Sequence, residues 1–210
     1  MTITTRDQLI NAMGNNSSRL VIDKASIGSQ TANSFSSLWR ATGQPGQGAI
    51  PTTAAVCNEQ LIGAIRFAQQ SGSATSYLAL LEAMCSNASS TLEIHDRLMH
   101  MGGLSGNVTA AQTVNLDISA NLANDNLEAR KGDANFSDVQ WWLEWYTATG
   151  STTVTVTVNV TYDDGSTGNL TGVSMTASRP ASHMIPINSL IPSSSSGRYI
   201  REVNTVSLSA

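Results

Sequence analysis

The feature of this sequence that constrains its fold most is a faultless alternation of apolar and polar residues between positions 153 and 162. Side chains alternate across a β-strand, so the apolar set points to one side and the polar set to the other. The apolar set consists of Val154, Val156, Val158, Val160 and Tyr162. The pattern predicts a long strand with one buried and one hydrated face.

The residues on both sides of this strand predict two antiparallel neighbours. The stretch before it alternates in the same way at Val139, Trp141, Leu143 and Trp145. Residues 148–152 then supply the break of a hairpin. Residues 163–166 indicate a turn, because Gly165 tolerates a positive φ and aspartate bonds its own backbone. A third strand is predicted over 170–177.

The first half of the chain carries different signals. Thr5 and Gln8 have the spacing of a capping box, and Gly14 ends the short helix that they predict. Apolar stripes of helical period predict three further helices over residues 54–70, 76–86 and 90–103. Residues 28–53 have no regular pattern, which is typical of a binding segment or an arm.

These elements together predict an α+β fold with an antiparallel β-sandwich or barrel in the C-terminal half. Additional strands are expected over 19–27, 114–118, 184–190 and 199–210. The expected organisation is an N-terminal helix and extended arm (1–53), a helical cluster (54–106) and an antiparallel β domain (107–210). We expect the last two to form one compact unit.

Composition narrows the class of partner. Only 12% of the residues are charged, about half the usual 25% or so, and the chain has two lysines, Lys24 and Lys131. A surface of hydroxyls and amides is cheaper to desolvate than a charged one, so it suits permanent contact with neighbours. The net charge of −4 argues against a nucleic-acid partner. Neither a membrane span nor a signal peptide is visible, so synthesis in a cytoplasm is expected.

No catalytic, cofactor-binding or metal-binding signature is present. His95 and His100 are five residues apart, which would put them on different faces of a helix. No nucleophile elbow, phosphate loop or dinucleotide fingerprint occurs. We therefore expect a protein that is not an enzyme and that needs no cofactor. Cys57 and Cys85 are expected to be reduced, buried core thiols.

Several phrases of the sequence resemble structural proteins of tailed bacteriophage particles. They are residues 144–152 with 162–166, residues 35–43, residues 179–187 and residues 201–210. The resemblance covers about a quarter of the chain. It implies a repeated, non-enzymatic part of a virion, made in the host cytoplasm, whose partners are further copies of itself and the major capsid protein or other virion proteins.

Within that class we favour a capsid decoration or cement protein over a tail or neck component. The candidate interface residues are Phe35, Leu38, Trp39, Arg40, Trp142 and Tyr146. Trp39 is either a plug folded back on its own core or an anchor in a neighbour's pocket. Trp142 and Tyr146 share one side of their stretch, so a carbohydrate-binding sandwich of a receptor-binding protein stays open as an alternative. Deletion of residues 30–50 is expected to leave the β domain folded and to prevent incorporation into particles.

Overall fold

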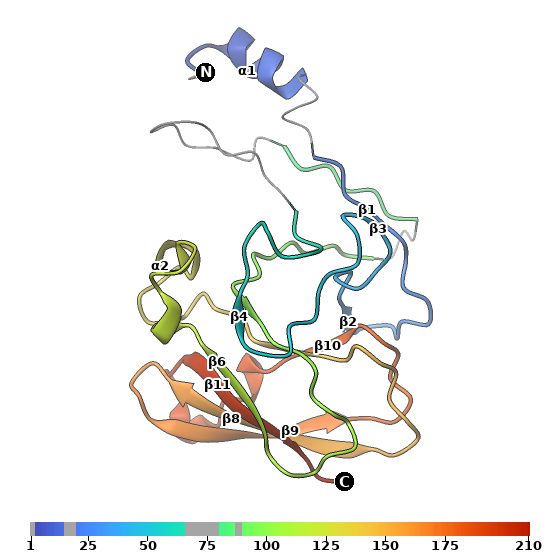
Figure 1. Ribbon diagram of the computed structural model, residues 1–210, viewed down its shortest axis with the longest axis vertical. Coiled ribbons are helices and arrows are strands. Elements are labelled where there is room, and N and C mark those ends of the chain that lie inside the picture. Colours follow the sequence, from blue (N-terminus) through green and yellow to red (C-terminus); the bar gives the residue numbers. More distant parts are fainter. Residues whose placement is uncertain (1–2, 15–19, 66–79, 87–89) are drawn as a thin grey trace.

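The computed structural model describes residues 3–14, 20–65, 80–86 and 90–210, and its body is built from antiparallel β-sheets (Figure 1). The largest sheet has the strand order β6-β11-β8-β9. Its strands are Gln112–Asp117, Ile200–Leu208, Val154–Tyr162 and Thr167–Met175, in that order. The second sheet, β2-β10-β7, consists of Phe35–Ser36, His183–Pro186 and Trp142–Glu144. The arrangement is sandwich-like and the described sheets do not close into a barrel, so the predicted α+β class is confirmed.

The alternating strand β8 forms the centre of the hydrophobic core, as its sequence predicts. Val156 and Val158 are each 1% exposed, and Val160 is fully buried. Val156 lies opposite Val173 of β9, and Val158 lies opposite Val206 of β11. Apolar side chains of three adjacent strands therefore share one face of the sheet, whose burial is the main contribution to its stability.

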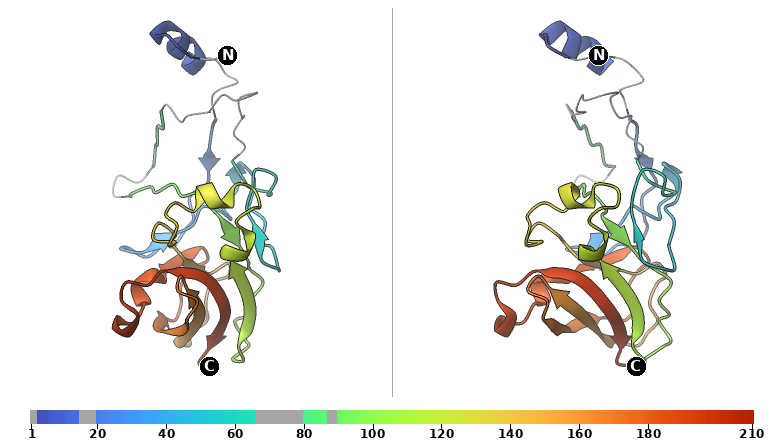
Figure 2. Two further views of the ribbon diagram at one scale, coloured as in Figure 1. Left: turned by 90° about the vertical axis from the view of Figure 1, so that its left-hand side faces the viewer. Right: turned by 60° about the vertical axis from the view of Figure 1, so that its left-hand side comes forward.

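The buried face of this sheet is covered by the chain between β6 and β8. The buried apolar residues of the core from that stretch are Ile118, Leu127, Phe136, Val139 and Trp141. The indole nitrogen of Trp141 donates a hydrogen bond to the carbonyl of Ile200 at 2.8 Å, so this cover is tied directly to β11. The short helix α2 (Leu127–Arg130) stands on the same side of the sheet as the N-terminal segments (Figure 2).

Two local signals in the sequence are confirmed by hydrogen bonds. The helix α1 (Arg6–Gly14) begins with the predicted capping box. The backbone N–H of Gln8 donates to the Thr5 hydroxyl, and the backbone N–H of Thr5 donates to Oε1 of Gln8, both at 3.3 Å. The turn between β8 and β9 has a φ of +83° at Gly165. There the Ser166 amide donates to the Asp164 carboxylate at 2.9 Å.

The predicted hairpin between residues 139–145 and 153–162 is wrong. Strand β7 pairs with β10 rather than with β8, with Leu143 opposite Ile185. The connecting loop follows the same pairing, since the Thr149 amide donates to the carbonyl of Arg179 at 2.9 Å. Alternation predicts a strand and its faces, but it does not specify the partner, and here two strands adjacent in sequence enter different sheets.

The helices predicted over 54–70, 76–86 and 90–103 are also wrong wherever the structure describes them. Residues 54–65, 80–86 and 90–103 contain no helix, and they contribute only β4 (Ala55–Val56) and β5 (Met99–His100). Their backbone groups bond across the chain, as in the 2.9 Å bond from the Cys57 amide to the carbonyl of Leu98. An apolar stripe stabilises a helix only when it covers a core, and long-range pairing prevails here. Residues 66–79 and 87–89 lie outside the described residues.

The remaining short elements connect these sheets. Strands β1 (Asp23–Lys24) and β3 (Gly43–Gln44) form a two-stranded ladder within the arm, so only a small part of the strand predicted over 19–27 is present. Within the described residues, three 3₁₀ helices occupy Ser119–Asn121, Asn188–Leu190 and Ser193–Ser195. No helix among the described segments has the length and hydropathy of a membrane span.

The two cysteines occupy different environments, which corrects the expectation that both are buried. Cys57 is 4% exposed, and burial raises the pKa of its thiol to about 11. Cys85 is exposed. The error follows from the wrong helix prediction. The helix whose apolar side would have buried Cys85 is absent from the described residues 80–86.

We expect a thiol-reactive dye to label one cysteine of the native protein and both after denaturation. Cys85 reacts because its side chain is accessible, whereas Cys57 is both inaccessible and almost entirely protonated at neutral pH. Mass spectrometry of the labelled peptides checks the assignment. A Cys85→Ser variant is the control and should take up no dye while it is folded; rapid labelling of that variant would show that Cys57 is accessible.

Candidate functional site

The main cluster of polar and aromatic side chains lies where the N-terminal segments meet strand β7. The cluster consists of Trp39 and Arg40 from the arm, Arg97 and His100 from the segment around β5, and Glu144 and Tyr146 from β7 and its continuation. We call it the junction cluster. Residues far apart in sequence meet here because β2 pairs with β10, which in turn pairs with β7.

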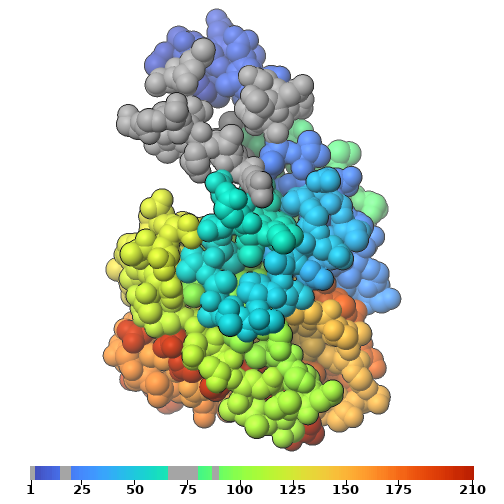
Figure 3. Space-filling view, viewed as in Figure 1, coloured from blue at the N-terminus to red at the C-terminus, as the bar shows by residue number. Residues whose placement is uncertain are grey.

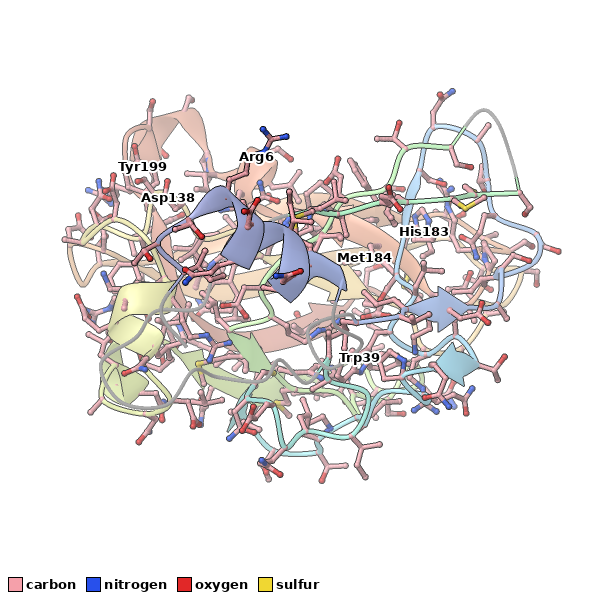
Figure 4. The ribbon with its side chains drawn as sticks, turned by 90° about the horizontal axis from the view of Figure 1, so that it is seen from above. Arg6, Trp39, Asp138, His183, Met184 and Tyr199 are labelled. Atoms are coloured by element: carbon pink, nitrogen blue, oxygen red, sulfur yellow. The ribbon has the colours of Figure 1, made fainter. Side chains whose placement is uncertain are left out.

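Trp39 packs inside its own chain, so the plug alternative describes its position. Its indole nitrogen donates to the carbonyl of Ala49 at 2.8 Å, and the Arg97 guanidinium carbon lies 4.6 Å from the centre of its ring. A Cβ atom on Gly48 would come within 2.0 Å of the ring, so only glycine fits beside it. Trp39 lies within the outline of the molecule when the structure is seen from above (Figure 4).

The residues next to Trp39 are fixed in the same way. The Arg40 guanidinium donates to the carbonyl of Gly48, and the Gln47 side chain donates to the carbonyl of Arg40 at 2.9 Å. Leu38 is different, because its side chain points outward and is 38% exposed. The arm is thus held by Trp39 and by Arg40, which donates to Gly48, and it presents Leu38 to solvent.

Glu144 is a nearly buried carboxylate beside one cation. Its side chain is 7% exposed, and its Oε2 lies 3.6 Å from the Arg97 guanidinium. The other oxygen, Oε1, has no hydrogen-bond partner among the described residues. Burial raises the pKa of Glu144, while Arg97 opposes that rise. Arg97 thus neutralises Glu144 and stacks on Trp39 at the same time.

His100 and Tyr146 form a second pair on the other side of Arg97. The His100 Nε2 and the Tyr146 hydroxyl are hydrogen-bonded, and the two ring centres are 5.9 Å apart. Burial, together with the nearby Arg97, lowers the pKa of His100 to about 4. Burial also raises the pKa of Tyr146, with a further contribution from Glu144. Both side chains are therefore neutral at physiological pH.

The remaining candidates, Phe35 and Trp142, lie together at the rim of this region. Their rings meet edge to face with centres 5.1 Å apart. The ring of Trp142 also packs edge to face with the ring of His95, and those two ring centres are 6.0 Å apart. Phe35 is 45% exposed. Tyr146, by contrast, is engaged with His100 and lies over Gly102. Trp142, in β7, and Tyr146, two residues beyond its end, therefore have different neighbours, although the alternation puts them on one side.

The chemistry available to the junction cluster is that of a clamp. Arg97 and the Glu144 carboxylate neutralise each other, and Arg40 donates to the carbonyl of Gly48. The imidazole of His100 and the phenol of Tyr146 bond to each other. The described residues include no group of three or more histidine, cysteine or acidic side chains placed to hold a metal ion. The arrangement joins the arm, the β5 segment and β7 into one body.

Sequence reasoning missed Arg97, His100 and Glu144 as members of this cluster. One signal was available, because Glu144 lies between Trp142 and Tyr146 on the same side of a strand. A carboxylate between two aromatic residues on one strand face requires a cation nearby. Nothing in the sequence indicated that Arg97 would supply it.

Comparison with known proteins adds no relative to this description. No family model, curated protein or solved structure matches the chain.

Proposed function

We propose that this chain is a non-enzymatic structural component of a bacteriophage virion, and specifically a decoration or cement protein of the capsid. It would stabilise the particle through repeated contacts with further copies of itself and with the major capsid protein or another virion protein. The proposal has two sources: the resemblance of several sequence phrases to phage structural proteins, and the distribution of apolar surface over the fold.

The observation that carries the proposal is the asymmetry of that apolar surface. Among the described residues, every large apolar side chain that is exposed lies between Ile3 and Val108. Residues 109–210, which contain most of the core, have none. Concentrated exposed apolar surface marks an interaction site on a soluble protein. The N-terminal half therefore has the surface of a subunit that is completed by its neighbours.

The few lysines of the chain support the same conclusion. Lys131 is 3% exposed, and its ammonium group donates to the carbonyl of Asp133 at 3.0 Å. The Lys24 ammonium group donates to the carbonyl of Gly46 at 3.0 Å. Lysine is depleted at protein contacts because its ammonium group is costly to desolvate. Here neither lysine extends freely from the surface, which leaves that surface suitable for broad contacts.

The outer face of the large sheet is polar and carries little charge. Thr155 and Asn169 are exposed there, and the Asn159 amide donates to the Asn169 side chain at 2.7 Å. Hydroxyl and amide groups are less costly to bury than charged groups when they find hydrogen-bond partners. Many such contacts of modest strength become firm when they are made at the same time by a repeated subunit.

Incorporation into particles tests this function. The structure changes the choice of variant, since deletion of residues 30–50 would remove β2 and the side chain of Trp39 from the junction cluster. We expect a variant that begins at Asp23 to keep the melting temperature of the β body within a few degrees and to lose most particle binding. The tagged full-length chain, supplied during phage assembly, is the control and should sediment with particles.

Electron microscopy of those particles should locate the full-length chain on the capsid surface. A position on the tail or neck would overturn the capsid assignment and retain the virion assignment. A monomer that binds sugars on a glycan array and associates with no particle would overturn the whole proposal.

A further inference from the structure

The N-terminal helix α1 has an apolar stripe that its own chain does not bury. Leu9, Ile10 and Met13 share one side of the helix and are 40%, 53% and 42% exposed. No residue of α1 is buried. The helix stands at the end of the molecule opposite to β8 and β9 (Figure 3). A nine-residue helix is marginally stable in water unless it packs against something, so this stripe requires a partner.

The same chain contains a cleft that can receive such a helix. It has a volume of about 3160 Å³ and lies between the N-terminal segments, the residues around 81–105 and the inner side of the sheets. Several of its lining side chains are apolar and strongly exposed, namely Leu81 (50%), Met84 (100%), Leu92 (54%) and Ile94 (54%). No residue of α1 lines this cleft.

We propose that α1 of one copy docks into this cleft of a second copy of the chain. The inference rests on the proposed function, because it names the contact through which copies associate. Helix α1, taken as a cylinder of about 10 Å diameter and 13 Å length, occupies roughly 1,100 Å³. That is about a third of the volume of the cleft, which extends from the arm to the inner side of the sheets.

Charge and stoichiometry favour a second copy as the occupant. Arg6 lies on the same side of the helix as Met13, and Figure 4 shows it projecting from α1. Glu82 and Glu93 of the cleft provide carboxylates for it. Each copy supplies one helix and one cleft, and copies joined in this way form a closed ring if their rotation closes.

Isotope-mixed crosslinking tests the contact. Chains that carry Met13→p-benzoylphenylalanine are prepared in unlabelled and ¹⁵N-labelled forms, mixed, irradiated and digested. We expect crosslinks from position 13 to residues 81–86 and 90–94, with mixed isotope patterns that identify them as contacts between chains. Crosslinks with uniform isotope composition would show that α1 folds into its own cleft, and crosslinks to other regions or none at all would show another partner; each of these outcomes overturns the proposal.

A pair of charge substitutions measures the strength of the contact. We expect Leu9→Glu/Ile10→Glu to weaken self-association about a hundredfold or more by analytical ultracentrifugation, because two buried apolar side chains become charged. Asn11→Glu, on the opposite side of α1, adds a charge without touching the stripe and should change the association less than threefold. Equal effects of the two variants would overturn the proposal.

Particle binding is measured separately for the same variants. A full-length chain that binds particles but does not associate through α1 would refute this inference and leave the proposed function standing. A chain that associates through α1 and binds no particle would support this inference and refute the proposed function.

Discussion

Replacement of Val156 by aspartate is expected to abolish soluble folding. Val156 is 1% exposed and lies opposite Val173, at the centre of the apolar face shared by β8 and β9. An ionised carboxylate among the apolar side chains around this position costs several kcal/mol to bury. Because an ordinary domain is stable by only about 5–15 kcal/mol, most or all of the stability is lost.

The matched control for this experiment is Thr155→Asp. Thr155 is the adjacent residue of β8, and its side chain is exposed on the outer face. The variant introduces the same charge on the same strand, so it should stay soluble and lower the melting temperature by a few degrees at most. Solubility after expression and melting followed by circular dichroism decide the comparison. If both variants behave like the wild type, the inward orientation of Val156 is refuted.

The strands were predictable from sequence where one face is buried and the other is hydrated. Strand β8 has this property from Val154 to Val160, and all its apolar residues are buried as the alternation indicates. Thr161 is the exception, because it lies on the polar side and is only 6% exposed. Strand β11 departs from this rule, because its buried residues Ile200, Val203 and Val206 are three positions apart and its pairing with β8 is irregular at two places. In β8 a slip by one residue would reverse the faces, so the sequence specifies its orientation strongly.

The order of the strands was not predictable in the same way. Leu143 pairs with Ile185, and β7 is separated from its neighbour β10 by the whole β8–β9 hairpin. The free energy that selects this partner comes from contacts between distant segments, including the bond from the Trp141 indole to the carbonyl of Ile200. Short-range patterns contain no record of such contacts. The wrong helix predictions over residues 54–103 have the same origin. The spacing of apolar residues there suggests a helix, but it does not show whether another part of the protein covers the apolar side.

The junction cluster illustrates both limits. Position along β7 predicts that Trp142, Glu144 and Tyr146 share a side, which is a local property. Their partners come from segments about 50 to 100 residues away in the chain, such as His100 for Tyr146 and Phe35 for Trp142. The choice between a plug and an anchor for Trp39 likewise depended on Ala49 and Arg97, and only the folded structure supplies both.

Replacement of Arg97 by methionine is expected to lower the stability of the fold strongly, because it breaks the ion pair of the junction cluster. Methionine keeps an unbranched apolar stem against Trp39 but removes the only cation that lies within ion-pair distance of Glu144 among the described residues. The nearly buried carboxylate then keeps only the weaker electrostatic contribution of Arg40, which forms no ion pair with it among the described residues. Breaking a fully buried pair costs about 3–5 kcal/mol, and we expect about 2–3 kcal/mol here because Arg97 is 29% exposed.

The loss depends on pH in a direction that the pKa shift determines. Burial already holds the pKa of Glu144 above its ordinary value of 4.5, and removal of Arg97 raises that pKa further. A carboxyl whose pKa is higher in the folded state destabilises the fold when it is ionised, and this effect disappears as it takes up a proton. The deficit of Arg97→Met should therefore be largest at pH 8 and shrink as the pH falls towards 4.5. Arg97 also helps to lower the pKa of His100, so its removal makes protonation of His100 at low pH less costly to the fold. This effect likewise reduces the deficit as the pH falls.

Glu144→Gln separates this electrostatic effect from a loss of packing. Glutamine has the shape of glutamate without its charge, so the double variant Arg97→Met/Glu144→Gln contains no unpaired ion. We expect it to be more stable than Arg97→Met alone at pH 8 and to show the smaller pH dependence of the two, as measured by urea denaturation between pH 4.5 and 8. If the second substitution restores nothing, the contribution of Arg97 lies in its stacking on Trp39, and the junction is held by aromatic packing rather than by neutralisation of a buried carboxylate.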